Sequence, residues 1–284
     1  MGYHYVPQEY LREFSVAGDR ATIWAFNRKS GVGSVLPIVR VAQSPGYYDD
    51  DTERRLNFEV EGPAHSALAR FRAGSLPEAE DRLRLAVYVA TMMKRVPARR
   101  RRSMVLVPVV IDDVISEVRE LIDEWRQQPT ATDAMIQRRT AEVEAFAAKA
   151  AVAPPDAVLS QVRSPWPSEQ HVELLLAMTW RIVQADPLNQ FITSDNPAYF
   201  FEAYGLAREA AEVTFPLAPD LALHMSWQGA RGSTQVVQAR PSLTKELNRR
   251  VVSGAEHFVF TAQPAPWLGR VARKADPFLS HLQW

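Results

Sequence analysis

The chain has 284 residues, 46% hydrophobic and 23% charged, which is near the average for folded proteins and far from the composition of disordered ones. Lysine plus arginine and aspartate plus glutamate both number 33, so no net charge draws the chain towards nucleic acid or acidic lipid. The absence of cysteine excludes disulfides, thiolate catalysis, cysteine-based zinc sites and iron–sulfur clusters.

The first fifty residues contain a short helix and a β-hairpin. Pro7 opens the helix at about 5–15, in which Tyr5, Leu11 and Phe14 are expected to be buried against the C-terminal half of the chain. The runs ATIWAF and VGSVLPIVRVAQ flank the turn NRKSG and predict strands within about 20–42.

The middle of the chain, about 52–186, reads as helical. A helix at 52–72 is expected to break at Gly62-Pro63, and a second helix at 77–96 ends before Pro97. Residues 111–126 form an amphipathic helix whose apolar positions, including Val114 and Leu121, are expected to face a core. Further helices are predicted at about 132–151 and, after a cap at Ser168, through to 185.

After residue 188 the pattern changes to short β-type runs, with one helix at 241–254. The strands at the two ends of the chain are each too few for a stable sheet, so they are expected to join in one small mixed or antiparallel sheet. We therefore predict a single, helix-rich α+β domain over 1–284, with strands at about 20–42 and 189–262.

No segment predicts a membrane span. The longest apolar run, SMVLVPVVI, is about half the length that a membrane helix needs and contains Pro108. The N-terminus has no basic region followed by an apolar stretch, so no secretory signal is predicted. We expect a cytoplasmic protein without a membrane partner.

Several motifs together resemble a known family. HYVPQEYLREF, IWAFNRKSG, KRVPARR, FITSDNP, FPLAP and the Leu247-Asn248 pair occur in the order and spacing of a bacterial family catalogued as domain of unknown function 4238. The resemblance covers nearly the whole chain and implies an intracellular α+β protein of no established activity. The site positions that it implies are His4, Gln8, Arg12, Arg95, Asp195, Asn196 and Asn248.

His4 and Asp195 are the main candidates for chemistry. A histidine is the commonest general base near neutral pH, although His4 could instead tie the N-terminal segment to a backbone carbonyl. Gln8 lies one helical turn further on. Asp195 and Asn196 end a strand, where catalytic groups often lie, but Asp and Asn before a proline are also turn formers.

Other charged residues leave two interpretations open. Glu59 and Glu61 could divide acid and base work or hold a divalent metal such as Mg²⁺, or they could belong to an exposed helix face. The arginine run at 99–102 suits either a helix C-terminus or contact with phosphates. No histidine spacing indicates zinc, and no phosphate-binding loop, dinucleotide fingerprint or nucleophile elbow occurs.

We expect His4, Gln8, Arg95, Asp195 and Asn196 to form one polar pocket. One hypothesis is a hydrolase or phosphoesterase, nuclease-like, with His4 as general base, Arg95 stabilising negative charge, and Asp195 orienting His4 or holding a divalent ion. The alternative is a non-catalytic binding or regulatory protein that recognises a small anionic ligand or nucleic acid. A third is that these motifs are purely structural.

Overall fold

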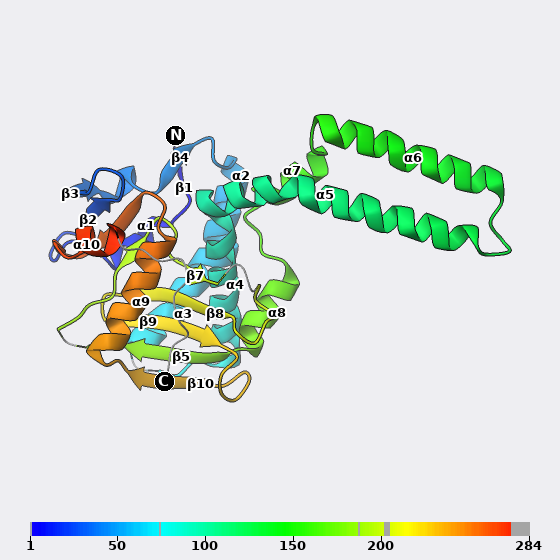
Figure 1. Cartoon of the computed structure of the whole chain (residues 1–284). Helices are drawn as coiled ribbons and strands as arrows, with labels where there is room; N and C mark the ends of the chain where they lie inside the picture. The colour runs from blue at the N-terminus through cyan, green and yellow to red at the C-terminus, as the bar shows by residue number, and fades with distance from the viewer. Residues whose placement is uncertain (1, 74, 187, 202–204, 274–284) are drawn as a thin grey trace. The chain divides into compact units, whose positions relative to one another are not determined.

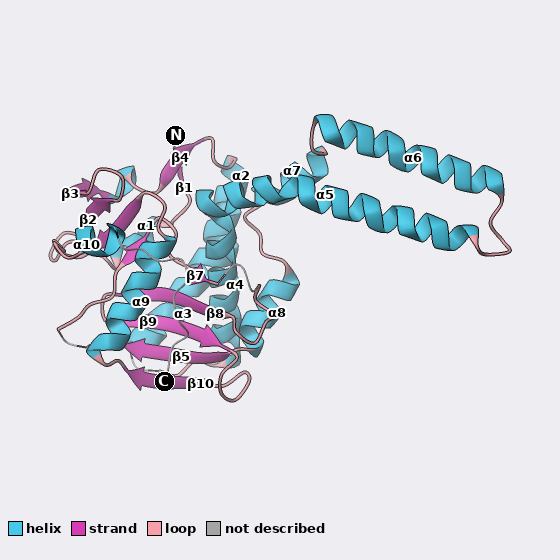
Figure 2. Cartoon of the chain, viewed as in Figure 1, coloured by secondary structure: helices cyan, strands magenta, loops and turns pink. Residues whose placement is uncertain are grey.

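The computed structural model describes residues 2–73, 75–186, 188–201 and 205–273. Pro97–Ser164 forms one compact unit, and the rest of the described chain forms the other. Both contain helices, whereas the strands all belong to the larger unit (Figure 2). The predicted α+β class is confirmed.

In the larger unit, a four-stranded antiparallel sheet joins the two ends of the chain. Its strands, in spatial order, are β3 (Val32–Pro37), β2 (Thr22–Asn27), β11 (Phe258–Thr261) and β6 (Thr193–Ser194). Gly31, with a φ of 72°, allows the tight turn between β2 and β3. The sequence predicted that strands from the two ends of the chain would join, but the reason, that neither end has enough strands for a sheet of its own, is wrong for the C-terminal half, which also forms a five-stranded sheet.

A second, five-stranded sheet was not predicted. Its order is β10 (Thr234–Gln238), β5 (Thr179–Gln184), β9 (Leu221–Ser226), β8 (Glu212–Ala218) and β7 (Tyr199–Phe200). Among the strand pairs formed by the described residues of this sheet, the β10–β5 pair alone is parallel. The helix expected to continue to 185 ends at Ala177, because the β-branched and aromatic run that follows forms the buried strand β5.

Helices cover both faces of this second sheet (Figure 1). Leu247 of α9 (Pro241–Gly254) packs with Val183 and Ala222 of the sheet. The opposite face packs on the helices that precede the smaller unit and on α8. These helices are α3 (Gly62–Arg72), α4 (Ala79–Arg95) and α8 (Glu169–Ala177), whereas α2 (Asp50–Arg55) has no buried residue.

Between α2 and α3 the chain continues as a π-helix, Leu56–Glu61. The break expected at Gly62-Pro63 is absent, because Pro63 lies in the first turn of α3, where its missing N–H is not needed. π-Helical turns are uncommon and often occur at functional sites.

The N-terminal segment is tied into the core of the larger unit. Strand β1 (Gly2–His4) pairs with β4 (Gln43–Pro45), and α1 (Gln8–Arg12) follows. Leu11 and Phe14 are fully buried, as predicted, in a core that also contains Phe215 of β8. A short 3₁₀ turn, Ile38–Arg40, and α10 (Leu268–Arg273) complete the unit.

The smaller unit consists of α5 (Pro97–Arg126), α6 (Asp133–Val152) and α7 (Asp156–Arg163). Its small core is built on Val107, Ile111 and Ile115 of α5. The prediction that Val114 and Leu121 face this core is wrong, since their exposed fractions are 48% and 61%. Two helices packed side by side bury only a narrow stripe of each, so part of the apolar face stays uncovered.

Candidate functional site

His4 ends strand β1 and lies beside the first residue of α1. The Nε2 atom of Gln8 is 3.4 Å from Nδ1 of His4, and only 8% of His4 is exposed. Burial lowers the pKa of His4, the nearby charge of Arg95 lowers it further, and the backbones of Ile38 and Val39 act in the opposite direction. The imidazole is therefore neutral at pH 7.

Arg95 ends α4 and is 1% exposed. Its Nη1 donates to Oε1 of Glu61 at 2.6 Å, and its Nη2 donates to the backbone carbonyl of His4. The hydroxyls of Tyr47 and Tyr48 both donate to the carbonyl oxygen of Arg95. Because both terminal nitrogens are engaged within the protein, Arg95 positions β1 against the π-helix rather than facing a substrate.

Glu61, the last residue of the π-helix, is the centre of a group of buried and half-buried polar residues that we call the Glu61 cluster. Its members all interact electrostatically with Glu61. They are His4, Glu53, His65, Tyr88 and Arg95.

Burial favours the neutral forms of the carboxyl and imidazole groups in this cluster. Burial raises the pKa of Glu53, helped by the charge of Glu61 and opposed by Arg95, whereas burial lowers the pKa of His65. The described residues include no group of three side chains arranged to hold a metal ion. Glu59 lies on an exposed helix face, which was one of the two predicted alternatives, and forms an ion pair with Arg55 there.

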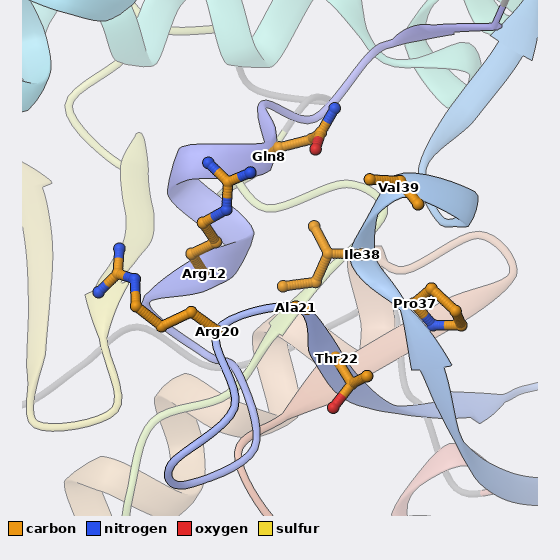
Figure 3. A pocket seen from close by; sticks show the side chains of 8 residues that line it. All are labelled: Gln8, Arg12, Arg20, Ala21, Thr22, Pro37, Ile38 and Val39. Carbon is orange, nitrogen blue, oxygen red and sulfur yellow. The ribbon is translucent and has the colours of Figure 1, made fainter.

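A pocket of about 500 Å³ lies beside α1 (Figure 3). Its lining residues come from α1, from the start of β2 and from the end of β3 with the following turn. They are Gln8, Arg12, Arg20, Ala21, Thr22, Pro37, Ile38 and Val39. Since Gln8, Ile38 and Val39 are also neighbours of the His4 ring, they stand between the pocket and the Glu61 cluster.

Two arginines, Arg12 and Arg20, are among the residues that line the pocket, and none of the described lining residues is acidic. Arg12 pairs with Glu9, and Arg20 lies 3.8 Å from Glu9 and 3.9 Å from Glu13. Arg72 lies 3.0 Å from Glu13. Arg12 and Arg20 therefore share Glu9 and Glu13, which do not line the pocket, and Arg72, also outside the lining, competes for Glu13.

Asp195 binds the backbone of the larger unit. Its carboxylate accepts hydrogen bonds from the backbone N–H groups of Glu256, His257 and Phe258, at 2.6–3.0 Å. Burial raises its pKa to about 6 against the opposing effect of these bonds. The turn interpretation of TSDNP describes this geometry, in which the carboxylate fixes the chain entering β11.

Asn196 and Asn248 also bind backbone. The Asn196 amide donates to the carbonyl of Gly254, and Asn248 bridges the N–H of Ile192 and the carbonyl of Gln190. These contacts attach the strand containing TSDNP to α9. They leave both amides in structural roles.

The predicted five-residue pocket therefore separates into two groups. His4, Gln8 and Arg95 lie together, but no hydrogen bond or ion pair among the described residues links them to Asp195 or Asn196. The N-terminal segment does reach FITSDNP at another point, where the Tyr10 hydroxyl lies 2.7 Å from Oγ1 of Thr193.

Sequence reasoning missed a second buried polar group, on the five-stranded sheet. Nε2 of His224 lies 3.1 Å from Oε2 of Glu212, to which Nη1 of Arg250 also donates at 2.7 Å. Burial lowers the pKa of His224 to about 4; burial alone would raise that of Glu212, but His224 and Arg250 bring it to about 2. A histidine inside the apolar run LALHMS was the available signal.

A comparison with protein families identifies the group to which the chain is related. The model of the family described as "Protein of unknown function (DUF4238)" matches residues 3–264. The chain belongs to the DUF4238 family. No curated protein and no solved structure matches this DUF4238 chain. In the part of the chain that the structure describes, no helix is both long and apolar enough to cross a membrane.

Proposed function

We propose that this DUF4238 chain binds a small organic anion in the pocket beside α1. The observation that carries the proposal is the combination of Gln8 and Arg12, which project from one helix, with an apolar wall of Ile38 and Val39 (Figure 3). Ligand pockets typically have volumes of about 300–1,000 Å³, are largely apolar and carry a few polar groups that orient the ligand. This pocket has that composition.

The chemistry of the lining limits the ligand class. A guanidinium binds carboxylate or phosphate through charge-assisted hydrogen bonds, and the Gln8 amide can donate a further bond to the same head group. Pro37, Ile38 and Val39 would cover an apolar body. Carboxylic acids and phosphate monoesters with an apolar body fit both requirements.

A small ligand is favoured over nucleic acid. Polyanion sites present a stripe of unshared cations along the backbone path. Here Glu9 and Glu13 lie among the arginines. These two carboxylates would repel the phosphates of a nucleic-acid backbone. Tight binding of single-stranded DNA with a steep salt dependence would contradict this choice.

The proposal is tested by thermal shift with three probes of similar shape: phenyl phosphate, benzoate and the uncharged benzamide. The two anions should raise the melting temperature and benzamide should not. Arg12→Ala should abolish the shift. The matched control is Arg54→Ala, which removes an arginine that also forms an i, i+3 ion pair on a short helix but does not line the pocket, and it should leave the shift unchanged. Equal loss in both variants would contradict a pocket-specific role.

The Glu61 cluster, which Gln8, Ile38 and Val39 separate from the pocket, favours ester hydrolysis as a second candidate. Burial lowers the pKa of His4 and raises that of Glu53, which favours a neutral imidazole that can accept a proton and a carboxyl group that holds its proton more readily than usual. The test is release of nitrophenol from p-nitrophenyl phosphate and p-nitrophenyl acetate, with Mg²⁺ and with a chelator. Turnover that survives His4→Gln would exclude His4 as the base.

A further inference from the structure

The helix α5 carries an apolar surface that its own unit leaves uncovered. Leu106, Val110 and Val114 have exposed fractions of 53%, 55% and 48%, and Leu121 follows at 61%. At about 3.6 residues per turn these positions fall on one strip of the helix. We call this strip the α5 face.

The α5 face is distinct from the side of α5 that packs within the unit. Val107, Ile111 and Ile115 form the small core with residues of α6 and α7. At about 100° per residue, Val107, Ile111 and Ile115 are rotated by about 60°, 100° and 140° from Val110, all towards the same side of the helix. The α5 face is therefore left exposed when α6 and α7 pack on α5.

Along α5, charges of opposite sign lie before and after the part of this strip formed by Leu106, Val110 and Val114. Arg99 and Arg102 precede it, and the exposed Glu117 and Glu120 lie towards the other end of the helix. The order along α5 is thus basic, apolar and acidic, which makes the helix complementary to a copy of itself that runs in the opposite direction.

From this pattern we infer that two copies of the chain associate through antiparallel packing of their α5 faces, with the twofold axis at Val110. Leu106 and Val114 each lie four residues from Val110, so each meets the other across the axis. Arg99 and Arg102 then come within one residue of the partner subunit's Glu120 and the partner subunit's Glu117. An isologous contact repeats every such pair twice.

A lipid surface explains the same residues less well. An interfacial helix has a basic polar face along its length, whereas the second half of α5 carries the acidic residues Asp112, Asp113, Glu117 and Glu120. Acidic lipid would repel that half. A second, antiparallel copy places acidic residues next to the basic end of the helix and basic residues next to its acidic end.

The absence of cysteine allows a direct test of the register in the full chain. Leu106→Cys and Val114→Cys variants, mixed and oxidised, should form a disulfide-linked dimer in the mixture, and neither variant should form one alone. Val110→Cys alone should crosslink. Val152→Cys, at another exposed valine of the same unit, is the matched control and should not crosslink. Self-crosslinking of Leu106→Cys would indicate parallel packing and overturn the inference.

A charge exchange tests the ends of the helix by light scattering. The wild-type chain should have the mass of two copies, and Arg99→Glu with Arg102→Glu should reduce it to one. Adding Glu117→Arg and Glu120→Arg to the same chain should restore the dimer. A wild-type chain that stays monomeric at about 100 µM, far above the dissociation constants of stable interfaces, would overturn the inference.

Discussion

Replacing Arg95 with methionine removes the cation of a buried ion pair while keeping most of the side-chain volume. Arg95 is 1% exposed, and its guanidinium binds both Glu61 and the carbonyl of His4. The variant leaves the Glu61 carboxylate buried without its partner, which costs about 3–5 kcal/mol in comparable pairs. Since whole domains are stable by only about 5–15 kcal/mol, a large part of the stability of the larger unit should be lost.

A double variant separates the effect of the unpaired charge on the free energy of unfolding from the effect of the changed side-chain volume. Arg95→Met combined with Glu61→Leu removes both charges, so its cost should be much smaller than the sum of the two single changes. Arg84→Met, which breaks a partly exposed pair with Glu80 on the same helix, is the matched control and should cost less than about 1 kcal/mol.

Urea unfolding followed by near-UV circular dichroism measures these differences in the free energy of unfolding. The reasoning would be refuted if the free energy of unfolding of Arg95→Met stayed within about 1 kcal/mol of the wild type, because a buried carboxylate that loses its cation destabilises a protein by more than that.

Three further predictions concern stability and are read from the same unfolding curves. Leu11→Ala should cost about 2–5 kcal/mol, since Leu11 is fully buried in the main core; an unchanged midpoint would mean that α1 does not dock. Asp195→Asn should cost about 1–3 kcal/mol, because an amide turns a donor towards at least one of three backbone N–H groups; no loss would contradict the anchoring role. The pKa of His224 is lowered to about 4 in the folded state, against about 6.5 unfolded, so the unfolded chain binds the extra proton. Stability from this group should be fully present above pH 6.5 and fall by about 3 kcal/mol towards pH 4, and a His224→Gln variant should lack that part of the pH dependence.

The sequence carried enough information for the α+β class and for the docking of the N-terminus. Leu11 and Phe14 share one helical face, and a local pattern of this kind reports burial directly. The strand after Ala177 was harder to predict, because a short apolar run such as TWRIVQ is compatible with a buried helix or a buried strand. Pairing with β9 and β10 makes this run a strand. Such pairing depends on residues far away in the sequence, so the local pattern does not predict it.

The candidate site could be predicted in part. His4, Gln8 and Arg95 were identified correctly as neighbours, but the role of Glu61 depends on a π-helix that turns its carboxylate towards Arg95. Asp195 looked like a site residue because a carboxylate at a strand end serves catalysis and turn formation equally well in sequence. Only its three backbone partners distinguish the two.

Isothermal titration of the full chain with phenyl phosphate tests the binding proposal most directly. We predict saturable binding of one ligand per chain, weakened at least about tenfold by Arg12→Ala, because a hydrogen bond to a charged group contributes about 1.5–3 kcal/mol, and unchanged by Arg54→Ala. Binding of equal strength in the wild type and Arg12→Ala, or no saturable heat at millimolar ligand, would contradict the assignment of this pocket as an anion site.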